Sequence, residues 1–147
     1  QVKSVDVVRA YIERISQVQP VLNAVVKDRF QDALREAALA DQLVRSGTKS
    51  TEQLAQEKPL LGVPFTAKNS VAIKGLRQDA GSAYYRGQRA ERDAAVVGHL
   101  RNAGAIPLAL TNVSELCMWG DTYNRLDGLT RNPYDTRRTP GGSSGTF

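Results

Sequence analysis

The chain has 147 residues, of which 41% are hydrophobic, with one cysteine and a formal net charge of +5. This length suits one domain with a sizeable core. A single cysteine excludes an intrachain disulfide framework and a cysteine-based zinc site. The basic residues are spread along the chain with few aromatic residues between them, so the charge favours a solvated surface and we predict no nucleic-acid partner.

No apolar run approaches the roughly 20 residues that span a bilayer, and no signal peptide is visible. These features favour an intracellular location. The chain starts at Gln1 rather than at methionine, so we expect it to begin inside a longer protein. Membrane association through a segment absent from this chain therefore stays open, as does a homodimer.

The hydrophobic pattern predicts helices that alternate with short apolar strands. Ser4 and Asp93 are the expected N-caps of two helices, and Pro20 is expected to end the first one. Alternating helices and strands are typical of an α/β layer fold, here a mixed sheet flanked by helices. The expected helices are 4–18, 30–44 and 94–102, with short helical stretches within 48–58 and at 114–119; the expected strands are 22–26, 60–67 and 105–110, and 120–147 is expected to be mostly loop.

Two segments carry residues suited to acyl-transfer chemistry. Lys68 ends the apolar run that starts at Gly62, and the loop from Thr139 to Gly145 holds three glycines around two serines. A desolvated lysine can act as a neutral base toward a serine hydroxyl. The alternative for Lys68, which composition alone favours, is a strand-end lysine whose ammonium reaches water.

Ser143 also lies in a Gly-x-Ser-x-Gly pattern that formally matches the nucleophile elbow of α/β hydrolases. That fold needs a strand before the serine and a histidine after it, whereas the sole histidine, His99, lies upstream in a predicted helix. An exposed or hydrogen-bonded helix histidine is the simpler interpretation, so a Ser-His-Asp mechanism is disfavoured.

Several short motifs follow one another along nearly the whole chain. They are Leu61-Gly62-Val63-Pro64 before Lys68, Gly104-Ala105-Ile106-Pro107 before Thr111-Asn112, then Asn124, Gly128, Thr130-Arg131-Asn132-Pro133 and Pro140-Gly141-Gly142-Ser143-Ser144-Gly145. Their order and spacing resemble the amidase-signature enzymes. Within that family, the segment 111–119 is most similar to the fatty-acid amide hydrolases, which implies a small, lipid-like amide substrate.

The resemblance implies a Ser–cis-Ser–Lys triad in which Lys68 is the lysine and Ser143 is the bridging serine after a cis peptide bond. It implies that Ser144 supports the lysine, and that the glycine loop around them supplies the required backbone turn. We therefore expect Lys68 and Ser143 within hydrogen-bond distance, about 2.6–3.2 Å. Neither a metal nor an organic cofactor is implied. The implied residues of loop support and substrate binding are Cys117, Met118, Gly141, Gly142 and Ser144, with Cys117 expected to pack as a small residue rather than to attack the substrate.

Two departures from the family pattern matter. The family's nucleophilic serine and its oxyanion-hole amides lie in a second glycine-rich stretch beyond Ser143, which these 147 residues do not include. Asn69 stands where an acidic residue usually follows the triad lysine. We therefore expect residues 1–147 to be the N-terminal portion of an amidase-signature domain, truncated before the nucleophile and inactive alone. The alternatives are an amidase like the A subunit of glutamyl-tRNA amidotransferase and a non-catalytic, amidase-like binding protein.

Overall fold

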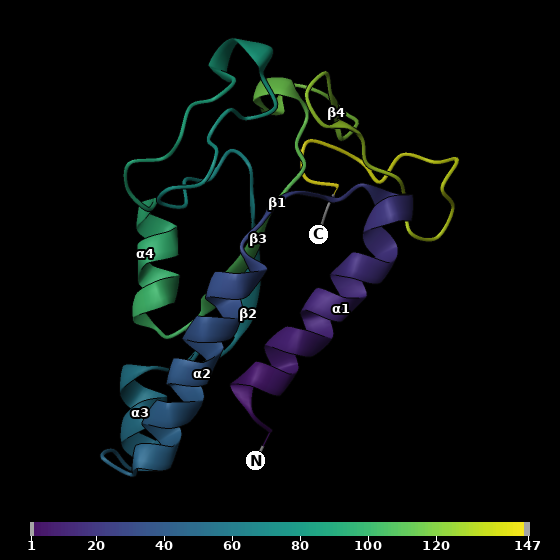
Figure 1. The fold of residues 1–147 in the computed structure, drawn as a ribbon. Coiled ribbons are helices and arrows are strands. Elements are labelled where there is room, and N and C mark those ends of the chain that lie inside the picture. Colours follow the sequence, from purple (N-terminus) through teal and green to yellow (C-terminus); the bar gives the residue numbers. More distant parts are fainter. Residues whose placement is uncertain (1, 146–147) are drawn as a thin grey trace.

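The computed structural model describes residues 2–145, in which helices pack against a small mixed sheet (Figure 1). Strand β3 lies in the centre, antiparallel to β1 on one side and parallel to β2 on the other. The predicted α/β class with a mixed sheet is confirmed. In chain order the elements are α1 (Ser4–Leu22), β1 (Val25–Asp28), α2 (Phe30–Ser46), α3 (Thr51–Glu57), β2 (Pro64–Lys68), the 3-10 helix η1 (Ala83–Tyr85), α4 (Ala95–Asn102), β3 (Ile106–Thr111), the 3-10 helix η2 (Glu115–Cys117), β4 (Tyr123–Asn124) and β5 (Gly128–Leu129).

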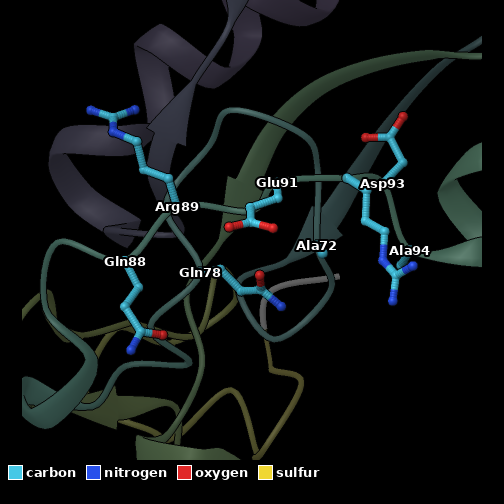
Figure 2. A pocket seen from close by; sticks show the side chains of 8 residues that line it. Ala72, Gln78, Gln88, Arg89, Glu91, Asp93 and Ala94 are labelled. Carbon is cyan, nitrogen blue, oxygen red and sulfur yellow. The ribbon is translucent and has the colours of Figure 1, made fainter.

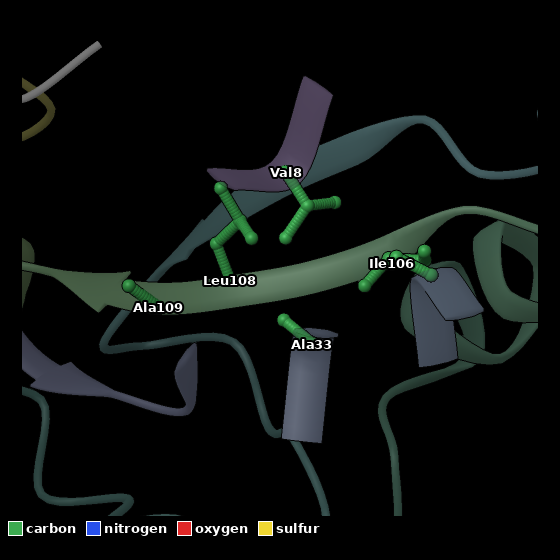
Figure 3. Packing of buried hydrophobic residues seen from close by; sticks show 6 residues of the cluster. Val8, Ala33, Ile106, Leu108 and Ala109 are labelled. Atoms are coloured by element: carbon green, nitrogen blue, oxygen red, sulfur yellow. The ribbon is translucent and has the colours of Figure 1, made fainter. Parts of the chain in front are cut away.

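Strand β3 is the centre of the hydrophobic core. All six of its residues are buried, which is typical of a strand covered on both faces. Leu108 belongs to one buried cluster with Val8 of α1 and Ala33 of α2 (Figure 3). A second cluster joins Leu110 of the same strand to Val97 of α4. Helices from both halves of the chain therefore fix the position of β3.

The start of α1 is capped by a residue from another helix. Lys3 holds the N-cap position without a side-chain bond and Ser4 is the first helical residue, so the predicted cap is wrong. Asp41 of α2 accepts hydrogen bonds from the backbone N–H groups of Ser4 at 2.7 Å and Val5 at 3.1 Å. Burial on its own would raise the pKa of Asp41, but these bonds outweigh it and hold the pKa below its usual value.

The end of α1 also differs from the prediction, because the helix continues past Pro20 to Leu22. Asn23 then adopts a left-handed conformation with φ of 52°. The Gln19 side chain stabilises this turn, since its Oε1 accepts from the backbone N–H groups of Ala24 and Val25 at 3.0 and 2.9 Å. Strand β1 therefore starts at Val25, later than expected.

The predicted cap of α4 is wrong as well. Ala94 holds the N-cap position without a side-chain bond. Asp93 instead accepts from the backbone N–H of Lys74 at 2.7 Å and forms an ion pair with Arg101 at 3.1 Å. The carboxylate thus ties the loop after β2 to α4.

No helix among residues 2–145 combines the length and apolarity that a membrane span requires.

We predict that Asp41→Ala lowers the free energy of unfolding by about 1 kcal/mol, the usual loss when a helix start loses its capping acceptor. The measurement is urea unfolding followed by circular dichroism. Asp32→Ala on the same helix is the control, because Asp32 is exposed and pairs with Arg35 of the next turn. Equal stability losses in the two variants would contradict the capping role.

Candidate functional site

Lys68 meets both serines of the glycine loop. It is the last residue of β2, opposite Thr111 at the end of the parallel strand β3. Its Nζ donates to Ser143 Oγ at 2.8 Å and to Ser144 Oγ at 2.7 Å. The expected proximity of Lys68 and Ser143 is confirmed. The ammonium is therefore held by protein hydroxyls, and Lys68 is only half-buried.

The glycine loop packs tightly against the segment that precedes β4. Gly141 has φ of 89°, and the Gly142–Ser143 peptide bond is cis. A Cβ atom at Gly142 would lie 2.6 Å from the backbone oxygen of Trp119. Glycine at this position therefore lets the loop lie directly on the backbone of residues 119–121.

A buried ionic network lies directly after Lys68 in the chain. Asn69 is 1% exposed, and its Nδ2 donates to Asp79 Oδ1 at 2.8 Å. Arg77 donates to Asp79 at 2.7 Å and, through both terminal nitrogens, to Asp127 at 2.7 and 2.9 Å. Residue 69 carries an amide rather than a carboxylate, but the carboxylate of Asp79 is hydrogen-bonded to that amide.

The network also sets the ionisation of Asp79. Burial on its own would raise the pKa of the Asp79 carboxyl, but the hydrogen bonds from Arg77, Asn69 and the Gly81 N–H, with the charge of Arg77, outweigh burial. The pKa of Asp79 therefore lies below its usual value, and the group is ionised at neutral pH.

Residues 6–145 match the sequence model of the amidase family. The chain belongs to the amidase family. Fatty-acid amide hydrolase 2-A of Danio rerio is 50% identical over 99% of this chain, and the matched part is 27% of that protein. The A subunit of the glutamyl-tRNA(Gln) amidotransferase of Treponema pallidum is 40% identical over 98% of this chain and 30% of its own length.

The fold agrees with this assignment. The native peptide amidase of Stenotrophomonas maltophilia superposes with a TM-score of 0.85 at 33% identity, covering 99% of this chain and 30% of that one. The chain thus spans less than a third of the length of each of these amidases. Its helices and mixed sheet are part of the larger amidase fold.

An apolar cavity of about 560 Å³ adjoins the serine loop of this amidase chain. Met118 is 78% exposed and Trp119 is 70% exposed, and both belong to its wall. The wall touches the loop because the backbone of Trp119 packs on Gly142. Such a surface suits an apolar ligand group. The full lining is Glu115, Leu116, Met118, Trp119, Tyr123, Asn124 and Arg125.

A second cavity, of about 460 Å³, is polar (Figure 2). Its wall carries Arg89 and Arg92 but also Glu91 and Asp93. Most of these side chains are exposed. With charges of both signs and little burial, this surface favours neither an anionic nor a cationic ligand.

The remaining sequence-predicted residues lie at different places around the site. Met118 lines the apolar cavity, whereas Cys117 is half-buried in η2 and lies outside the lining of that cavity. His99 is exposed on α4. Among residues 2–145, no three histidine, cysteine or acidic side chains are grouped so that they could hold a metal ion.

Sequence reasoning missed the Arg77–Asp79–Asp127 network and Thr122. The hydroxyl of Thr122 is bonded to both ends of the glycine loop. Neither group lies in a recognisable motif. Charge alternation at positions 77 and 79 was a signal, but it did not indicate the partner at position 127.

We predict that Arg77→Met destabilises the protein by about 3 kcal/mol at pH 7, because it leaves a buried carboxylate without its cation. In the wild type, the lowered pKa of Asp79 contributes stability above about pH 4 that is lost as pH falls through the folded-state value. In the variant, only the hydrogen bonds from Asn69 and the Gly81 N–H still oppose burial, so the pKa of Asp79 rises and acidification relieves part of the loss.

Urea unfolding of both proteins between pH 4 and 7 tests this. Arg89→Met is the matched control, since Arg89 is exposed and its guanidinium donates to a neutral acceptor, the Gly75 carbonyl. A stability difference between Arg77→Met and wild type that did not shrink on acidification would contradict the assignment.

Proposed function

We propose that this chain carries the base and the proton relay of a Ser–cis-Ser–Lys amide hydrolase. The observation that carries the proposal is the pair of hydrogen bonds from Lys68 Nζ to Ser143 Oγ at 2.8 Å and Ser144 Oγ at 2.7 Å. In this proposal Lys68 is the base, Ser143 relays the proton, and a serine outside residues 1–147 attacks the amide carbon.

The relay runs along one hydrogen-bonded line. With Lys68 as a neutral amine, the Ser143 hydroxyl donates its proton to Nζ and takes the proton of the attacking serine. The new C–O bond forms as the proton leaves that serine. In the next step the protons move back along the same line. The departing amine nitrogen takes one proton, and the C–N bond of the amide breaks. Ser144 holds Nζ on the line throughout.

We further propose a fatty-acid amide as the substrate. The 50% identity to fatty-acid amide hydrolase 2-A supports this class. The apolar cavity beside the serine loop also supports it, because moving an acyl chain from water into such a cavity lowers the free energy. The similarity to the A subunit of glutamyl-tRNA(Gln) amidotransferase makes transfer chemistry on a polar amide the second candidate. Comparing turnover of oleamide and glutamine by the complete enzyme separates the two.

We predict that residues 1–147 alone hydrolyse neither oleamide nor an anilide, since they supply a base and a relay but no attacking group. Missing oxyanion donors would cost a further ~3 kcal/mol each in the transition state. The measurement is product release by the purified chain, with its Lys68→Ala variant as the control. Turnover that Lys68→Ala abolishes would refute the placement of the nucleophile outside this chain.

We predict that Lys68→Ala and Lys68→Arg both reduce turnover of the complete enzyme by about 100-fold or more, the usual contribution of a positioned base. Arginine keeps the charge and much of the bulk but cannot lose its proton. Both variants are measured at neutral and alkaline pH, and thermal unfolding checks that each is folded.

Lys74→Ala is the matched control, because Lys74 is an exposed lysine a short distance further along the chain. It is expected to keep wild-type turnover. Near-full activity in Lys68→Arg would show that Lys68 has a structural role only, and the base would have to be sought elsewhere.

A further inference from the structure

We infer that Thr122 is a positioning residue that fixes the serine loop where Ser143 and Ser144 meet Lys68. The inference rests on the proposed function, since it assigns the source of the geometry on which that function depends. The hydroxyl of Thr122 bonds to the backbone of the loop. It therefore acts on the serine hydroxyls through that backbone rather than by direct contact with them.

The hydroxyl of Thr122 binds the loop at both ends. Its Oγ1 donates to the Gly141 carbonyl at 2.7 Å and accepts from the Gly145 N–H at 3.0 Å. Thr122 is 0% exposed, so water does not compete for either bond. One side chain thus closes the loop whose middle carries Ser143.

Thr122 is tied to the segment that follows β3. Its backbone oxygen accepts from the Thr130 N–H at 2.9 Å, directly after β5. Asn124 of β4 donates to Asn112 Oδ1 and to the Val113 carbonyl, both at 2.8 Å, directly after β3. Because the last residue of β3 pairs with Lys68, these contacts lie at the end of the sheet where Lys68 stands.

The packing leaves the loop little room to compensate for a lost bond. A Cβ atom at Gly145 would lie 2.7 Å from Thr122 Oγ1, and one at Gly142 would lie 2.6 Å from the Trp119 oxygen. Removal of the hydroxyl takes away the partner of the Gly141 carbonyl and of the Gly145 N–H. Such groups move to find other partners, and the serines move with them.

The test uses the complete enzyme and the pair Thr122→Val and Thr122→Ser. Valine matches the shape of threonine without the hydroxyl, so kcat is expected to fall about 10- to 100-fold, as displaced catalytic groups usually cause. KM is expected to stay within about twofold, because the loop serves the chemical step rather than binding. Thr122→Ser keeps the hydroxyl and is expected to restore kcat.

Ser50→Ala is the matched control. Ser50 caps α3, outside the contacts that hold Thr122, and its hydroxyl also makes two bonds, accepting from the Gln53 N–H and donating to Glu52 Oε2. It is expected to lower the melting temperature while the folded enzyme keeps its kcat. An equal fall of kcat in Ser50→Ala, or an unrescued fall in Thr122→Ser, would overturn the inference.

Two further results separate the inference from the proposed function. If Lys68→Ala is inactive but Thr122→Val has wild-type kcat, the inference fails and the function stands. If Lys68→Ala keeps full turnover, the function fails and the inference fails with it.

Should Thr122→Val not fold, Thr122→Cys replaces it, because a thiol is a weak donor close in size to the serine hydroxyl. Its kcat is expected below that of Thr122→Ser, and equality would overturn the inference.

Discussion

The hydrogen bonds from one ammonium to two serine hydroxyls are the constraint on which the arrangement of the site depends. Lys68 and Ser143 lie 75 positions apart in the chain. Bonds of this kind need their atoms placed within a few tenths of an ångström. The parallel pairing of β2 with β3 brings Lys68 level with Thr111 and hence with the segment that leads to the loop. The fold of the described residues can be understood as the support for that single contact.

Much of the support that lies close to the site is polar. The helices and β3 pack through apolar side chains such as Val8, Leu108 and Val97. Beyond the ends of β2 and β3 the fully buried side chains include Asn69, Asn112 and Asn124. Apolar packing fixes distances between elements, but hydrogen bonds also fix direction. A site that must aim two hydroxyls at one nitrogen benefits from directed contacts, and each is costly to leave unpaired when buried.

Local sequence patterns predicted the helices and strands well, because periodicity and capping glycines act over a few residues. The helix predicted at 30–44 is α2, Phe30–Ser46, and Gly47 ends it in a left-handed conformation. The contact of Lys68 with Ser143 followed from the family resemblance, since no local pattern links a strand end to a distant loop. The two wrong caps share one cause, which is a partner far along the chain. Asp41 caps α1 from 37 positions away, and Asp93 bonds to Lys74 instead of capping α4.

The same cause explains why the residues that hold the site are harder to predict than the residues that form it. Lys68 and the serines lie in motifs because their chemistry restricts their type and spacing. Thr122 acts through a hydroxyl that bonds to backbone groups, and Asp79 acts through a carboxylate that bonds to an amide. Several residue types, at several positions in the sequence, can place such a group there. In this chain Asp79 reaches Asn69, so the carboxylate that is absent at position 69 is present in space. In this chain the carboxylate beside residue 69 comes from a residue ten positions further along, which no local pattern predicts.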